Sequence, residues 1–159
     1  MESLRIFRIK WSVILGMVFL LPILGGCQDD GLPNEIRTIN DAYVAIVGSW
    51  EWVETVSLNR IDKSIRKTSP ATEDKSIQYV FQKDNKLTIT DGGLTNNYLY
   101  SLELNSGGDG FNSTFWLISR NIENDSETKE PIQFGKDGML VFYHMSVPIS
   151  HSFRRVMLE

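Results

Sequence analysis

The sequence is poor in the residues that most often carry chemistry. It contains a single cysteine, Cys27, so no disulfide can form within the chain. Its two histidines, His144 and His151, are seven residues apart on what should be neighbouring strands, so a shared metal is one alternative. With no third ligand indicated, we instead expect satisfied or surface histidines and no metal site. The sequence also lacks a Gly-x-Ser-x-Gly turn, a His-Glu-x-x-His helix and a glycine-rich phosphate loop. We predict that the protein is not an enzyme and carries no cofactor.

Positive charge is scarce as well. The chain has 16 lysines and arginines against 20 aspartates and glutamates. Three of the basic residues and one of the acidic residues lie in the first 26 positions, so the remaining chain holds 13 basic and 19 acidic residues, a net charge of −6. Nucleic acids and anionic lipid surfaces are bound by basic faces, and this balance argues against both as partners.

Only one long apolar run is present, from Trp11 to Leu24. Basic residues precede it and Gly25-Gly26 follow it, an order typical of a secretory signal peptide. A membrane-spanning helix needs about 20 apolar residues. This run is shorter and contains Pro22, which disfavours a continuous helix, so we predict a signal peptide over residues 1–26.

The segment Leu24-Gly25-Gly26-Cys27 ends this run and resembles the lipobox of bacterial lipoproteins. In that family the cysteine thiol takes a diacylglycerol and the chain is cleaved before the cysteine. The resemblance implies that Cys27 is lipidated, with palmitate among the acyl chains, and that these chains hold the protein at a membrane. Each buried methylene contributes about 0.8 kcal/mol to such an anchor.

Residues 27–37 are expected to form the lipidated cysteine and a flexible tether, because they include Gly31, Pro33 and little apolar content. Asp29-Asp30 resemble the acidic tag of some surface-exposed lipoproteins of Gram-negative bacteria. A plain solvated tether is the alternative. We expect a lipoprotein of the cell envelope in the outer membrane of a Gram-negative cell, with exposure at the cell surface left open.

Residues 38–159 are predicted to form one folded domain. A short helix is expected from Thr38 to Val47, with Asn40-Asp41 as its N-cap pair and Gly48 as its stop. Short runs rich in β-branched and aromatic residues follow. They span roughly Trp50–Leu58, Ser76–Gln82, Lys86–Thr90, Asn97–Leu104, Phe111–Ser119, Pro131–Phe134, Met139–His144 and Ser150–Leu158. Two charged stretches, Asn59–Lys75 and Asn121–Glu130, are expected as longer loops. About eight strands predict an all-β antiparallel barrel or sandwich.

The two ends of this domain favour the barrel. Gly48-Ser49-Trp50 opens the first run and Arg155 lies in the last, a pairing that resembles the lipocalin-like pattern. The resemblance implies a small antiparallel up-and-down barrel of about eight strands, in which Trp50 plugs the closed end and Arg155 packs across its ring. We expect the guanidinium to lie within about 6 Å of the ring. Gly48, Trp50 and Arg155 are thus the predicted closure residues.

The expected barrel interior supplies the candidate ligand-lining residues. These are Trp52, Glu54, Tyr79, Phe81, Tyr98, Tyr100, Trp116 and Phe142. Strict alternation puts Glu54 on the same face as Trp50 and Trp52, whereas a β-bulge would return it to solvent. An eight-stranded barrel is narrow enough for its own side chains to fill. A ligand cavity and a filled core therefore remain alternatives.

Two functions follow from these alternatives. The first is a lipid-anchored barrel that binds a small apolar or amphipathic molecule. The second is a non-enzymatic structural or interaction protein with a filled barrel, whose loops bind another envelope protein or a glycan. An interior pocket of several hundred cubic ångströms favours the first, and a packed interior favours the second.

Overall fold

The computed structural model describes residues 36–105, 114–135, 137–144 and 147–156. The predicted signal peptide, Cys27 and nearly all of the tether lie outside these residues. Residues 106–113, which include the start of the fifth expected strand, and the last three residues also lie outside them. Within the described residues, no helix is long and apolar enough to cross a membrane.

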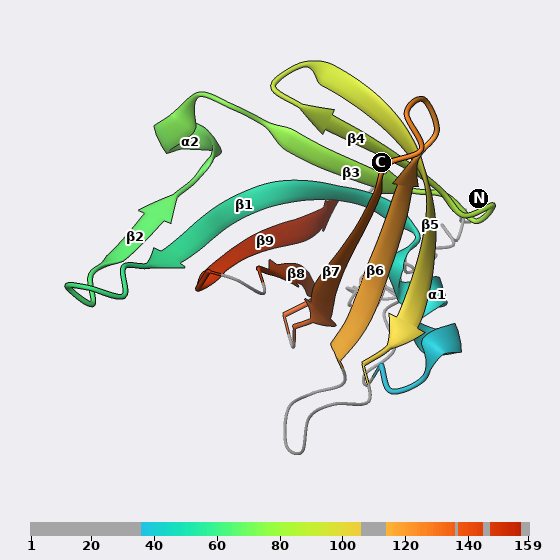
Figure 1. Cartoon of the computed structure of the whole chain (residues 1–159), viewed down its shortest axis with the longest axis horizontal. Coiled ribbons are helices and arrows are strands. Elements are labelled where there is room, and N and C mark those ends of the chain that lie inside the picture. The colour runs from blue at the N-terminus through green and yellow to red at the C-terminus, as the bar shows by residue number, and fades with distance from the viewer. Residues whose placement is uncertain (1–35, 106–113, 136, 145–146, 157–159) are drawn as a thin grey trace, which may run out of the picture.

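The described chain forms a closed antiparallel barrel of eight strands, which confirms the predicted fold class (Figure 1). In chain order the elements are α1 (Ile39–Ile46), β1 (Gly48–Leu58), β2 (Ile65–Thr68), α2 (Pro70–Glu73), β3 (Ile77–Phe81), β4 (Lys86–Asp91), β5 (Leu94–Leu104), β6 (Thr114–Asn121), β7 (Glu127–Phe134), β8 (Met139–Tyr143) and β9 (Ile149–Val156). From β3 to β9 each strand pairs with the next, and β9 returns to pair with β1.

Strand β1 is shared between three neighbours. Along one edge it pairs with β9, from Ser49 opposite Val156 to Ser57 opposite Ile149. Along the other edge its first residues pair with β3 and its last four residues pair with β2. Strand β2 therefore stands outside the closed ring, and Figure 1 shows it following the far end of β1 away from the barrel.

Both stretches expected as long loops contain regular structure, so that expectation was wrong. Asn59–Lys75 holds β2 and α2, the latter with Pro70 in its first turn. Asn121–Glu130 holds a tight turn and the first residues of β7. The side chain of Asn121 accepts the backbone N–H of Glu123 at 2.8 Å, which closes that turn. Glu127 and Lys129 of β7 are exposed on its outer face, and their charge made the strand look like a solvated loop.

Helix α1 packs against one end of the barrel, which we call the closed end. Its N-cap is Thr38, and Asp41 completes a capping box with it, so the cap precedes the predicted Asn40-Asp41 pair. The helix buries Ala42, Ala45 and Ile46. The Tyr43 hydroxyl accepts the backbone N–H of Leu102 in β5 at 2.9 Å, which fixes the helix to the barrel wall.

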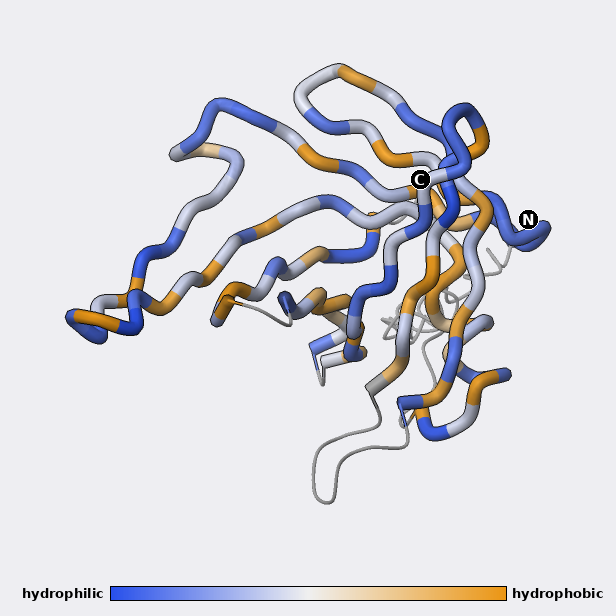
Figure 2. The backbone as a smooth tube through the Cα atoms, viewed as in Figure 1, coloured by the Kyte–Doolittle hydropathy of each residue, from blue (hydrophilic) through white to orange (hydrophobic). Residues whose placement is uncertain are grey.

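Alternate residues of each strand face the interior, and Figure 2 shows apolar and polar positions alternating along the backbone. Toward the closed end these side chains are tightly packed. The fully buried ones in the strands are Trp50, Phe81, Leu87, Phe115, Leu117, Ile132 and Leu140. The closed end is therefore a solid apolar core that leaves the opposite end of the interior as the place for a site.

Candidate functional site

The closed end is sealed by the predicted pair of Trp50 and Arg155. The two residues lie opposite each other in the β1–β9 ladder, and the guanidinium carbon is 5.5 Å from the centre of the indole ring. This confirms the predicted contact. The buried indole Nε1 donates to the carbonyl of Ile46 at 2.7 Å. The Arg155 guanidinium donates to the carbonyls of Ala45, at 3.2 Å, and Val47. The pair thus joins the first strand, the last strand and the end of α1.

Gly48 makes room for this arrangement. Its φ of +137° is one that residues with side chains rarely adopt, and a Cβ there would lie 3.2 Å from Nε of Arg155. We expect Gly48→Ala to destabilise the barrel by about 1–3 kcal/mol, from backbone strain and displacement of the guanidinium. Denaturant unfolding measures this. Gly135→Ala is the control, since its Cβ would make only ordinary contacts of 3.5 Å, and an equal loss in both variants would contradict the proposed crowding.

The opposite end of the interior, which we call the open end, combines aromatic and polar side chains. Residues directly opposite each other in a ladder lie on the same face of the sheet. Thr55 is opposite His151, and His151 is opposite Phe142, so all three face the interior. The open end is lined by Trp52, Thr55, Tyr79, Tyr98, Glu130, Phe142, His144, His151 and Phe153.

Three aromatic rings form the floor of the open end. The ring centres of Tyr79 and Phe153 are 4.8 Å apart, those of Tyr79 and Phe142 are 5.1 Å apart, and those of Phe142 and Phe153 are 5.2 Å apart. Trp52, which is 6% exposed, lies opposite Phe153 in the β1–β9 ladder. Two of these contacts are edge-on and that of Tyr79 with Phe142 is tilted, and such aromatic pairs stabilise by about 0.5–1.5 kcal/mol each beyond area burial. The floor is therefore a rigid apolar surface.

A chain of polar contacts runs above this floor from β1 to the end of β8. The indole Nε1 of Trp52 donates to the hydroxyl of Thr55 at 3.0 Å, and that hydroxyl lies 2.7 Å from Nδ1 of His151. Nε2 of His151 lies 3.2 Å from Nε2 of His144. Burial lowers the pKa of His151, and the neighbouring His144 lowers it further. Both imidazoles are therefore held close together with their Nε2 atoms facing.

Glu130 brings a carboxylate to the same end. Burial raises the pKa of Glu130, and the nearby His144 acts in the opposite direction. Burial also raises the pKa of Tyr79, with Glu130 as the next cause, so the tyrosine and the carboxylate lie near each other. No hydrogen bond or ion pair within the described part of the chain satisfies the Glu130 carboxylate. Such a group is well suited to meet a donor or a cation on a bound partner.

Among the described residues, no group of three or more histidine, cysteine, aspartate or glutamate side chains is placed so that it could hold a metal ion. The chain matches no protein-family model, no curated protein and no solved structure. The likeness to lipocalins therefore rests on the closed eight-stranded barrel and on the contacts among Gly48, Trp50 and Arg155.

Glu54 does not line the interior. The β1–β9 register shifts between Trp52 and Glu54, as a β-bulge requires, and from there Thr55 faces His151. The Glu54 carboxylate lies 3.4 Å from Nζ of Lys67, on the other face of the sheet. The candidate ligand-lining role of Glu54 is thus wrong, and the bulge alternative is confirmed.

Trp116 is also misplaced as a ligand-lining residue. Its strand neighbours Phe115 and Leu117 are the buried ones, and Trp116 lies opposite Glu103 on the outer face. Nζ of Lys129 stands 5.3 Å from the centre of its ring and pairs with Glu103 at 2.7 Å. Trp116 is therefore part of a solvated charge–aromatic cluster on the outside of the barrel.

The remaining candidates face the interior in two different ways. Phe81 and Tyr100 are 1% and 4% exposed, and their rings meet edge-on at 5.1 Å, so they fill the core. Tyr79 and Tyr98 are only partly buried, and Phe142 lies in the floor of the open end. Sequence reasoning missed Thr55 and Glu130, because their positions depend on a bulge and on long-range register.

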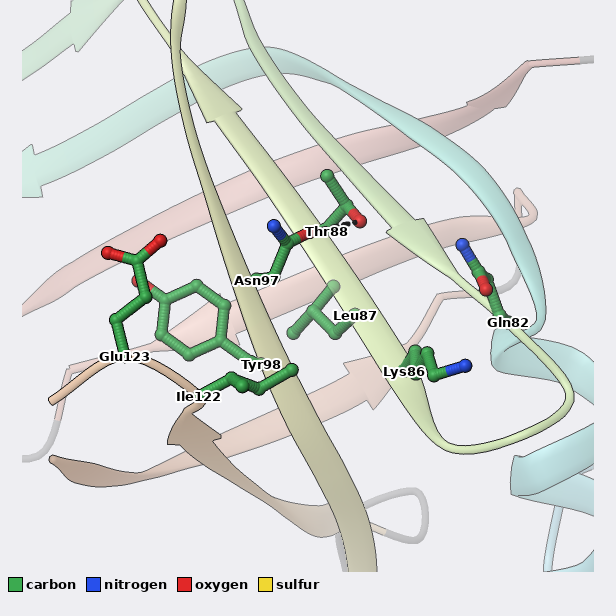
Figure 3. A pocket seen from close by; sticks show the side chains of 8 residues that line it. All are labelled: Gln82, Lys86, Leu87, Thr88, Asn97, Tyr98, Ile122 and Glu123. Carbon is green, nitrogen blue, oxygen red and sulfur yellow. Dashed lines mark hydrogen bonds between the residues drawn. The ribbon is translucent and has the colours of Figure 1, made fainter. Parts of the chain in front are cut away.

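A surface pocket of about 270 Å³ lies between β4, β5 and the β6–β7 turn and shares Tyr98 with the open end (Figure 3). Leu87 and Tyr98 contribute apolar surface to it. Its charged residues, Lys86 and Glu123, lie at opposite ends of the group in Figure 3 and do not converge on a common point. The open end of the barrel is the stronger candidate, because its polar groups do converge.

Proposed function

We propose that this protein is a lipid-anchored envelope lipoprotein whose barrel holds a small apolar or amphipathic molecule at its open end. The observation that carries the proposal is the contrast between the two ends of one interior. The closed end is filled and sealed, whereas large interior side chains toward the other end remain partly exposed. Those side chains are Ile77, Tyr79, Ile89 and Tyr98. Their exposed surface is what a bound molecule would cover.

The chemistry of the open end favours an amphipathic ligand. Ligand sites are mostly apolar, with a few polar groups that orient the bound molecule. Here the partly buried Tyr79 and Tyr98 supply aromatic surface beside the buried rings of Phe142 and Trp52, while His144 and Glu130 supply hydrogen-bonding groups near the rim. An apolar tail would lie on the rings, and a polar head would meet the imidazoles and the carboxylate.

Intrinsic tryptophan fluorescence and thermal unfolding test this proposal on the purified full-length chain, with fatty acids, retinoids and haem as probes. A ligand at 100 times its Kd is expected to stabilise the fold by about 2.7 kcal/mol. Because Trp52 lies at the open end and Trp116 on the outside, Trp52→Phe should lose much of the fluorescence response while Trp116→Phe keeps it. A panel that changes neither fluorescence nor melting would leave the proposal unsupported.

The β1–β2 hairpin favours the interaction protein as a second candidate function. Ile61 and Ile65, at its far end, are 94% and 66% exposed. Strand β2 ends the sheet order, so its outer edge has no strand partner among the described residues. An exposed strand edge with apolar side chains is a common docking place for another chain. A silent ligand panel would make this candidate the better one.

A further inference from the structure

Three side chains with metal-binding atoms project into the open end from neighbouring strands. His151 lies in β9 and stands opposite Phe142 of β8, which in turn stands opposite Ile132 of β7. Continuing the β7–β8 register by two residues brings Glu130 opposite His144. Two imidazoles and one carboxylate therefore share one face of three adjacent strands.

The spacing of the two imidazoles suits a shared metal ion. Their Nε2 atoms are 3.2 Å apart. Zinc binds histidine nitrogen at about 2.0–2.1 Å in tetrahedral geometry, which places two nitrogen ligands of one ion about 3.3 Å apart. A proton shared between the rings gives a similar spacing. A metal ion would take that proton's place without moving either side chain far.

The surroundings of His151 fit the role of a ligand. A metal-bound histidine usually donates its other ring N–H to an oxygen, which fixes the ring and its tautomer. The Thr55 hydroxyl, 2.7 Å from Nδ1, can accept that proton while it also accepts from Trp52. Nε2 of His151 then keeps its lone pair free. His144 is exposed at the rim, which gives an ion a way in.

The carboxylate supplies a third donor. Glu130 has no hydrogen-bond or ion-pair partner among the described residues, and the nearby His144 opposes the effect of burial on its pKa. In the described conformation the three side chains do not form a metal site, so Glu130 has to turn toward the imidazoles before an oxygen can bind the ion. Two histidines with one glutamate form an established donor set for zinc, with water in the fourth position.

We propose that His144, His151 and Glu130 bind one divalent transition-metal ion of the zinc class at the rim of the open end. Imidazole nitrogen favours zinc, copper and nickel over calcium and magnesium. The ion would fix the ends of β7, β8 and β9 together. This metal site is independent of the proposed binding of an apolar molecule, because no atom of an organic ligand is needed to complete the metal coordination.

The test is a zinc titration of the untagged, metal-stripped full-length chain by calorimetry, with cobalt as a spectroscopic probe. We expect one ion per chain and a cobalt visible spectrum typical of four-coordinate nitrogen and oxygen ligands. The chain has no other histidines, so His144→Ala or His151→Ala should each abolish binding. Because no organic ligand is present, this test and the ligand panel succeed or fail separately.

Two matched variants sharpen the assignment. Glu130→Gln should weaken zinc binding, whereas Glu127→Gln, an exposed glutamate of the same strand, should leave it unchanged. Thr55→Val keeps the shape of the side chain and removes the hydroxyl that positions His151, so it should weaken binding by about 10-fold to 100-fold and alter the cobalt spectrum. Metal-free melting curves check that each variant folds. No zinc binding, or binding kept by His151→Ala, would overturn the site, and equal affinity in the two glutamate variants would overturn the role of Glu130.

Discussion

Replacing Trp50 by alanine is expected to destabilise the barrel by about 3–5 kcal/mol, as do other large truncations in packed cores. The indole is fully buried between α1 and the strands, so its removal leaves a cavity at the closed end. The carbonyl of Ile46 also loses the donor that now lies 2.7 Å away. The guanidinium of Arg155 loses the ring 5.5 Å from its carbon. Urea unfolding followed by circular dichroism measures the change.

Two variants serve as controls for this prediction. Trp116→Ala removes the same side chain from the outer face and should cost clearly less, because the indole is only partly buried there. Arg154→Ala should change stability by less than about 0.5 kcal/mol, since Arg154 is exposed while its neighbour Arg155 makes the closure contacts. Equal losses for Trp50→Ala and Trp116→Ala would contradict the closure mechanism.

Cys27→Ala is expected to abolish lipid attachment altogether. No other cysteine can replace the thiol, so labelled palmitate should no longer enter the protein, and the chain should be found uncleaved or released from the membrane. Metabolic labelling and membrane fractionation measure both effects. The control is a chain with Asp29 and Asp30 replaced by alanine, which should still be labelled. Palmitate incorporated into the Cys27→Ala chain would show that the lipobox assignment is wrong.

The fold class and the closure pair could be predicted because both leave local marks in the sequence. Alternating apolar residues and Gly/Asn/Asp turns mark most of the strands. Gly48 and Trp50 stand together after a short helix, so the start of the barrel is readable without any long-range information. The contact of Arg155 with Trp50 could be predicted on one further assumption, that the last strand pairs with the first. The fold class and the closure pair could therefore be predicted from short stretches of sequence.

The parts of the site that could not be predicted depend on register. A bulge after Trp52 moves Thr55 inward and Glu54 outward. No residue type in that segment predicts a bulge at this position. Trp116 lies in a strand with apolar residues on both faces, where alternation cannot tell inside from outside. Glu130 comes near His144 only because β7 pairs with β8, in a ladder that ends two residues before it would reach them. Each of these positions depends on a partner strand as well as on its own sequence.

Closure by the last strand also sets the order in which this chain can fold. Arg155 donates to carbonyls 108 and 110 positions earlier, so the seal at the closed end forms only after almost the whole chain has been made. Contacts between such distant residues are entropically slow to form. Before β9 pairs with them, β1 and β8 each expose an unpaired strand edge, and such edges promote aggregation. A nascent chain halted before β9 should therefore depend on chaperones, whereas one that includes Arg155 can seal itself.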